Sequence, residues 1–214
     1  MKKLLSILLL FTLFLSAQNY ESAWKEVQKF EKKSLPKSSL KKVEEIYQQA
    51  KKEKNEIQFI KALLYKEKNL FRLNEEGYVK VIQDIEEAIN QSPNRSSQLI
   101  LTSILAQTYY QYLDRNRYNS NRTPLKENKS RDIRTWSLEK LSKKSTQLYL
   151  DSLDKLSQKV DINNYISILN KSKNVESLRP TLYDFLAFRA LNYFKTAQKF
   201  DSFTIKTPDA FESA

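Results

Sequence analysis

The sequence has little or none of three residue types on which many active sites depend: its 214 residues include one glycine, no cysteine and no histidine. Average usage would give about fifteen glycines in a chain of this length. Gly77 alone cannot build a dinucleotide fingerprint or a phosphate-binding loop, because both need several glycines at fixed offsets. Without cysteine or histidine there is no zinc finger, no Cys–His nucleophile pair and no imidazole base. Any catalysis would have to use carboxylates, lysines, tyrosines or hydroxyl groups.

These remaining reactive side chains form no pattern that indicates a catalytic or metal site. Acidic residues are adjacent at 44–45, 75–76 and 86–87, and neighbours on a helix point about 100° apart, so each pair is expected on a solvated face. The aspartates between positions 151 and 161 lack the glycine and the ligand spacing of a calcium-binding loop. We therefore expect a protein that is not an enzyme and holds no cofactor or metal. The alternative is a carboxylate- or lysine-based hydrolase, which nothing in the sequence positively supports.

The scarcity of glycine and proline favours helices, because sandwiches and barrels use both residues in their many turns. Apolar residues recur at helical spacing through most of the chain. The segments with this spacing run from Tyr20 to Phe30, Leu40 to Ala50, Phe59 to Phe71, Val79 to Ile89, Ser96 to Arg115, Thr135 to Leu156, Tyr165 to Leu169 and Tyr183 to Phe194. The segment 96–115 has the broadest apolar face, so we expect it at the centre of the fold.

Local signals predict where these helices begin and end. Pro36 is expected in a break between helices at 34–38, because proline in a helix interior removes a backbone hydrogen bond. Gly77 is expected in the left-handed conformation at a helix end. Thr181 and Asp184 have the spacing of a capping box at the start of the last helix. The periodicity also assigns Leu156 and Leu191 to inward-facing positions.

The first seventeen residues have the features of a secretory signal peptide. Lys2 and Lys3 precede an apolar stretch over 4–15, and the small residues Ser16 and Ala17 follow it. Twelve helical residues rise about 18 Å, which is too short for a hydrocarbon core of about 30 Å. We expect cleavage near Ala17, no membrane span afterwards, and a periplasmic or extracellular location in a bacterium.

The mature chain is expected to form one all-α domain over residues 18–200. Helices with short connections predict an array of antiparallel helix pairs, either tetratricopeptide-like or an irregular helical bundle. The segments differ in length and show no strict 34-residue repeat. Residues 201–214 change in character and are interpreted as a linker toward a further C-terminal part.

The net charge of +12 leaves the type of partner open. A basic exported protein could bind an anionic partner such as a membrane surface or a cell-wall polymer. Glutamates interrupt the lysines, however, as in the stretch 51–56. Solvated lysine faces are the favoured interpretation, and we expect no nucleic-acid partner.

Aromatic and arginine side chains gather around a polar segment at 116–134, which is expected to be an exposed loop. This composition is typical of protein interfaces, and it predicts a protein-docking surface. The competing interpretation places Tyr109 and Trp136 in the core. The candidate docking residues are Tyr109, Tyr112, Arg115, Arg117, Tyr118, Arg122 and Trp136.

Three groups of residues resemble the N-terminal helical region of very large bacterial α2-macroglobulin-like proteins. The first is YESAWKEV at 20–27 with LPKS at 35–38, followed by Ile46–Tyr47 and IKAL at 60–63; the second is RTWSL at 134–138. The third and most specific is LRPTLYDFLAFRAL at 178–191. Together they cover roughly residues 18–200.

The resemblance implies a secreted or periplasmic protein whose full-length form inhibits endopeptidases by entrapment after cleavage of a bait segment. The Cys-Gly-Glu-Gln thioester of some members is absent from this sequence, which has no cysteine, so no functional residue is carried over. The region would be a scaffold or docking module, with downstream macroglobulin domains, proteases or envelope proteins as partners. The alternative is a free-standing exported helical-repeat adaptor that binds protein or an anionic cell-envelope polymer.

Overall fold

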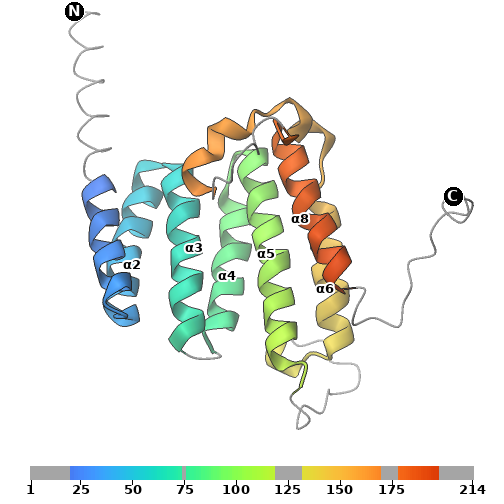
Figure 1. The fold of residues 1–214 in the computed structure, drawn as a ribbon, viewed down its shortest axis with the longest axis horizontal. Helices are drawn as coiled ribbons and strands as arrows, with labels where there is room; N and C mark the ends of the chain where they lie inside the picture. Colours follow the sequence, from blue (N-terminus) through green and yellow to red (C-terminus); the bar gives the residue numbers. More distant parts are fainter. Residues whose placement is uncertain (1–19, 74–75, 119–131, 170–177, 198–214) are drawn as a thin grey trace, which may run out of the picture.

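The computed structural model describes residues 20–73, 76–118, 132–169 and 178–197, and this part of the chain is all-α (Figure 1). No β-strand occurs within these ranges, where an isolated bridge pairs Asp161 with Thr181. The expected signal peptide at 1–17 and the expected linker at 201–214 lie outside them. The helices span residues 20–32, α2 Pro36–Glu53, α3 Glu56–Leu73, α4 Glu76–Gln91, α5 Arg95–Asn116, η1 Ile133–Thr135, α6 Leu138–Asp151, η2 Lys155–Lys159, η3 Ile162–Ile168 and α8 Leu182–Ala197.

Helices that follow one another in sequence also pack against one another. Figure 1 shows α2, α3, α4 and α5 side by side in chain order, with α6 and α8 beyond α5. α5 packs against α3, α4, α6 and α8. The predicted central position of this helix is confirmed, because its apolar side chains cover most of its circumference and need neighbours on several sides. Among the described helices, none combines the length and the apolarity needed to cross a bilayer.

Backbone conformation explains the connections at both ends of α2. Pro36 is the first residue of α2 rather than part of a break, because the first position of a helix needs no N–H donor and suits the fixed φ of proline. The turn before it is made by Ser34, whose φ is 54°. Lys54 ends α2 in the left-handed conformation, with φ of 55° and ψ of 33°. These two left-handed residues reverse the chain without glycine.

The predicted capping box at the start of α8 is confirmed. The N–H of Asp184 donates to Thr181 Oγ1 at 3.2 Å, and the N–H of Thr181 donates to Asp184 Oδ2 at 3.1 Å. The Thr181 hydroxyl also donates to the same carboxylate oxygen at 2.6 Å. The two side chains therefore satisfy backbone donors that the first helical turn leaves free.

The prediction for Gly77 is wrong. Gly77 lies inside α4 and its φ is not positive. A Cβ atom built on it would lie 2.6 Å from the carbonyl oxygen and 2.8 Å from the carbonyl carbon of Leu70 in α3. The glycine is therefore needed for the close approach of two helices, and its conformational freedom at a helix end is not used.

Two predicted core positions are also wrong. Leu156 is 65% exposed because α6 ends at Asp151 and Leu156 lies in the separate helix η2, which breaks the helical phase of the stripe. Leu191 is 49% exposed on the outer side of α8. Tyr193 is buried on α8 in contact with Tyr149 of α6, their ring centroids 4.6 Å apart.

Candidate functional site

The structure places two of the predicted docking residues in the core. Tyr109 and Tyr112 are 2% and 1% exposed. The ring of Tyr109 stacks on Trp136, with centroids 5.7 Å apart and an interplanar angle of 11°, and the ring of Tyr112 meets Tyr78 of α4 at 5.3 Å. These tyrosines hold α5 to its neighbours, so their rings are not available to a partner, which corrects their assignment to an exposed surface.

Of the other candidates, Trp136 follows η1 and is half-buried against Tyr109, whereas Arg115, Arg117 and Tyr118 lie at the end of α5 or just beyond it. Arg115 is exposed and its Nη1 donates to the carbonyl oxygen of Phe71 at 3.2 Å. Arg117 pairs with Asp114 and lies 5.3 Å from the ring of Tyr118, which is 86% exposed. Arg122 lies outside the described residues, as does most of the predicted loop. A docking role for Arg115, Arg117 and Tyr118 stays a prediction.

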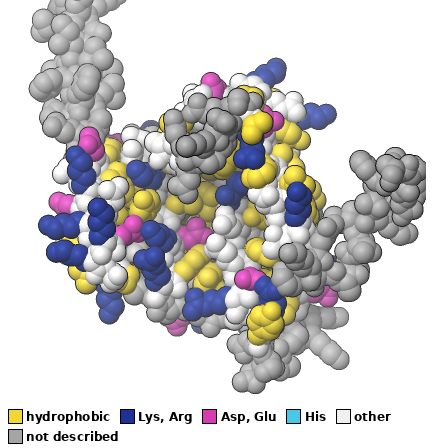
Figure 2. All heavy atoms as spheres, viewed as in Figure 1, with side chains coloured by type: hydrophobic (Ala, Val, Ile, Leu, Met, Phe, Trp, Pro, Cys, Tyr) yellow, Lys and Arg dark blue, Asp and Glu magenta, His cyan; other side chains and the backbone are white. Residues whose placement is uncertain are grey.

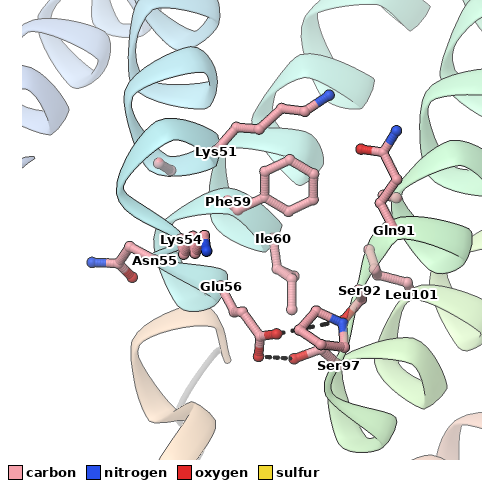
Figure 3. A pocket seen from close by; sticks show the side chains of 13 residues that line it. Lys51, Lys54, Asn55, Glu56, Phe59, Ile60, Gln91, Ser92, Ser97 and Leu101 are labelled. Atoms are coloured by element: carbon pink, nitrogen blue, oxygen red, sulfur yellow. Dashed lines mark hydrogen bonds between the residues drawn. The ribbon is translucent and has the colours of Figure 1, made fainter.

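A pocket of about 480 Å³ opens between the turn that joins α2 to α3 and the turn that joins α4 to α5 (Figure 3). The volume lies in the range of small-molecule and cofactor sites, about 300–1,000 Å³. Four helix ends and their connections contribute to the wall. The lining residues are Ala50, Lys51, Lys54, Asn55, Glu56, Phe59, Ile60, Ala88, Gln91, Ser92, Pro93, Ser97 and Leu101.

A carboxylate and two hydroxyls lie at one end of this pocket. Ser97 Oγ donates to Glu56 Oε2 at 2.7 Å, and Ser92 Oγ lies 3.5 Å from Glu56 Oε1. Glu56 belongs to the first turn of α3, where the Asn55 side chain accepts from the N–H of Gln58 at 3.2 Å. The contacts join the α2–α3 turn to the α4–α5 turn and hold this end of the pocket in place.

The lining of the pocket includes two lysines and an exposed amide, Lys51, Lys54 and Gln91. Lys51 Nζ lies 3.4 Å from Glu87 Oε1 of α4. Lys54 is exposed, and its backbone is held in the left-handed conformation described above. Gln91 Nε2 donates to Glu87 Oε1 at 2.8 Å, and in Figure 3 the amide oxygen of Gln91 faces the gap beside Phe59. The pocket thus combines an apolar interior with lysines and a hydrogen-bond acceptor at its entrance.

A buried lysine joins α3 to the helices on both sides. Lys66 is 4% exposed, and its Nζ lies 2.9 Å from Glu44 of α2 and 2.9 Å from Asp84 of α4. The ring of Tyr47 lies 4.7 Å away. Burial opposes the charge, but the hydrogen bonds to Asp84 and Glu44 outweigh burial and raise the pKa of Lys66. This lysine stays charged and links helices.

A second buried polar cluster joins α3, α5 and α8. Glu67 is 9% exposed and accepts from Thr108 Oγ1 at 2.6 Å. Burial raises the pKa of Glu67 to about 7, although the Thr108 hydrogen bond and the charge of Arg189 act in the opposite direction. Arg189 donates to Ser103 Oγ at 2.8 Å and to Gln107 Oε1 at 2.6 Å. Each charged group is engaged with residues of a neighbouring helix.

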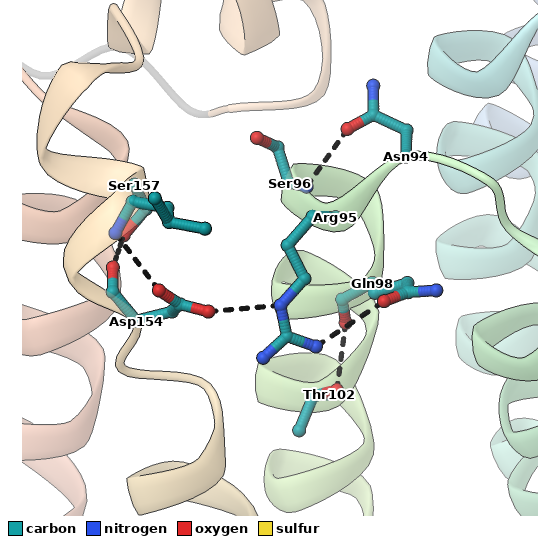
Figure 4. A network of polar contacts seen from close by, with 8 residues as sticks. Asn94, Arg95, Ser96, Gln98, Thr102, Asp154 and Ser157 are labelled. Atoms are coloured by element: carbon teal, nitrogen blue, oxygen red, sulfur yellow. Dashed lines mark hydrogen bonds and ion pairs between the residues drawn. The ribbon is translucent and has the colours of Figure 1, made fainter.

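A surface network fixes the start of α5 to η2 (Figure 4). Arg95 Nε donates to Asp154 Oδ2 at 3.0 Å, while Asp154 Oδ1 accepts from the N–H of Leu156 at 2.9 Å. The backbone hydrogen bond from Leu156 and the bond from Arg95 lower the pKa of Asp154. Asp154 is therefore a cap for η2 that also ties η2 to α5.

Comparison with known proteins adds no assignment: no protein-family model, curated protein or solved structure matches the chain. Within the described ranges, no group of three or more acidic residues is placed to hold a metal ion. The sequence did not predict the pocket between the two turns. The turns themselves are visible at 54–55 and 92–94, but no signal in the sequence shows that the two meet.

Proposed function

We propose that this chain is a non-catalytic helical module whose role is to bind protein. The observation that carries the proposal is the contrast between the pocket and the buried charges. The pocket is open and largely apolar with a few polar groups at its edge, as binding sites are. Lys66, Glu67 and Arg189, the strongest chemical candidates, are instead engaged in joining helices to one another.

We further propose that the helices form an irregular array of antiparallel pairs. Two residues separate α2 from α3, and three separate α4 from α5. Each of these pairs packs together, and α3 packs against α4. In such an array each pair buries its apolar face on the next, as in tetratricopeptide arrays. Lengths of 18, 18, 16 and 22 residues for α2 to α5 favour an irregular form.

For the protein as a whole, we propose an exported α2-macroglobulin-like protein whose full-length form inhibits endopeptidases. Support comes from the residues that carry the resemblance. Tyr20, Trp24 and Val27 are buried in the first described helix, and Leu182 and Leu186 are buried in α8. The resemblance is thus largely one of core positions, so it supports a scaffold role for this region. Its partners would be downstream macroglobulin domains, with proteases or envelope proteins as further candidates.

A second candidate function is a free-standing exported adaptor that binds an anionic polymer. Figure 2 shows lysine and arginine side chains gathered over residues 20–32, α2 and α3, with acidic side chains among them. A shallow groove of α2, α3 and α4 is lined by Lys37, Lys41 and Lys80 beside Glu44 and Glu45. The acidic side chains lower the local potential and favour the protein-binding role over this one.

The size of the native gene product separates the two candidates. An antibody against residues 20–197 should detect a product several times heavier than the 25.3 kDa of this chain if the macroglobulin proposal is right. A native product of that smaller mass would support the adaptor. If the native product is the larger one, deletion of residues 20–197 from it should reduce its inhibition of endopeptidases. Substrate turnover by the purified chain alone would overturn the non-catalytic role.

A further inference from the structure

We propose that the pocket between the α2–α3 and α4–α5 turns binds an extended peptide segment that carries apolar side chains next to acidic ones. The proposal rests on the protein-binding role proposed above and names the ligand class of one site. Three features of the pocket favour such a ligand: the apolar wall, the lysine Lys54, unpaired in the described part of the chain, and the acceptor of Gln91.

The wall of the pocket selects an apolar side chain. Phe59 and Ile60 of α3 line one side, and Pro93 and Leu101 line the other. An apolar side chain that enters gains about 25 cal/mol for each Å² of apolar surface removed from water. Lys54, Gln91 and Pro93 are exposed members of the lining, so the pocket opens to solvent at the edge formed by the turns.

The charges at the mouth select an acidic neighbour for that side chain. Glu87 balances the charge of Lys51, whose Nζ lies 3.4 Å from it, and Glu56 keeps its negative charge while it accepts from Ser97 at 2.7 Å. Within the described residues, no carboxylate forms an ion pair with Lys54. A ligand carboxylate would therefore pair with Lys54 and not with Lys51. Exposed pairs of this kind contribute little energy, so the charge orients the ligand and the apolar contact holds it.

The acceptor at the mouth favours a peptide over a fatty acid. Gln91 donates its Nε2 hydrogen to Glu87, and its Oε1 faces the gap beside Phe59 (Figure 3). An amide oxygen at this place matches a backbone N–H of a peptide that crosses the mouth. A fatty acid offers an apolar body and a carboxylate but no donor for Gln91.

The test is a titration of the ¹⁵N-labelled chain with acetyl-Asp-Leu-Phe-Glu-amide, followed by NMR. Saturable shifts are expected for the backbone amides of Asn55, Ser92 and Ser97. Gln91→Trp, which covers the mouth from an exposed position, should weaken binding by a factor of about 10 or more, since each 1.4 kcal/mol is tenfold. Its control is Gln147→Trp, because Gln147 is exposed and donates to Asp151 at 2.8 Å in the same way on α6.

Charge is tested with a second pair of variants. Lys54→Glu should weaken peptide binding by a factor of about 3 to 10, the effect expected for one exposed ion pair lost and one repulsion gained. Lys52→Glu changes the net charge equally, but Lys52 does not line the pocket, so binding should stay close to that of the parent. Equal loss in both variants would overturn the role of Lys54.

Three outcomes would overturn the proposal as a whole. They are the absence of saturable shifts at millimolar peptide, equal binding of acetyl-Lys-Leu-Phe-Lys-amide, and tighter binding of decanoate than of the acidic peptide. The helical-module proposal is judged separately, by the native product and its inhibition of endopeptidases. A pocket that binds no peptide would leave that result unchanged.

Discussion

Gly77→Ala should destabilise this protein although the glycine lies within a helix. Alanine at a helical position usually stabilises by about 0.4–1 kcal/mol, because it reduces the conformational entropy of the unfolded chain. At Gly77 the added methyl would lie 2.6 Å from the carbonyl oxygen of Leu70. That oxygen belongs to the backbone of α3, so it cannot move away as the end of a flexible side chain could. The methyl can be accommodated only if α3 and α4 separate.

The size of the effect follows from these two opposing contributions. Forcing an extra methyl group into a packed interface typically costs about 1–3 kcal/mol. The overlap at Gly77 involves three atoms of Leu70 within 3.0 Å, which places the cost toward the upper end of that range. After the entropic gain is subtracted, the free energy of unfolding should fall by about 1–2 kcal/mol. For a chain of this size, this corresponds to a decrease in Tm of about 2–8 °C.

The measurement is urea unfolding followed by far-UV circular dichroism. The control is Asn90→Ala, an exposed position of α4 away from Leu70, where alanine should leave stability unchanged or slightly raise it because its helix propensity is higher. A lower midpoint for Gly77→Ala with an unchanged slope is expected. If Gly77→Ala is as stable as the parent or more stable, the close approach of α3 and α4 is not a constraint and the reasoning fails.

Three further predictions concern the capping box and the buried charges. Thr181→Ala should lower the free energy of unfolding by about 1 kcal/mol, since it removes the side-chain cap of α8. Thr181→Ser keeps the hydroxyl and should therefore retain most of this stability, and an equal loss in both variants would contradict a capping role. The pKa of Glu67 is raised from 4.5 to about 7 in the folded state. Between pH 4.5 and pH 7 the folded protein therefore keeps a proton on Glu67 that the unfolded chain has released. The stability that this group contributes is therefore present below about pH 4.5 and is lost as the pH rises through 7, by up to about 3 kcal/mol. Glu67→Gln should remove this contribution to the pH dependence of the urea midpoint, measured from about pH 5 to 8. An unchanged pH dependence in the variant would refute the assignment. Lys66→Met should lower the free energy of unfolding by about 2 kcal/mol. The loss is smaller than for a fully buried ion pair because the side chains of Glu44 and Asp84 are 40% and 21% exposed. Full recovery of the urea midpoint in Lys66→Met/Asp84→Leu would support the pairing, and a Lys66→Met variant as stable as the parent would oppose it.

The sequence determined the all-α class of the fold and the approximate position of most helices. A helical stripe needs only the spacing of apolar residues, and a cap needs only residues three positions apart. Thr181 and Asp184 were therefore predictable as a pair, and so was the central place of α5. The turn near Asn55 followed from local sequence in the same way, and its structure depends on Lys54 in a left-handed conformation.

The tertiary structure decided which of these stripes meet and at what distance. Periodicity shows that a face is apolar but does not identify the helix that covers it, so Tyr109 and Tyr112 could be assigned to a surface although they are core residues. The role of Gly77 depends on a backbone atom seven residues earlier in another helix. The pocket depends on two turns about forty residues apart, joined by Glu56 and Ser97. Such contacts are long-range in the chain, and no local pattern encodes the separation and rotation of helices on which they depend.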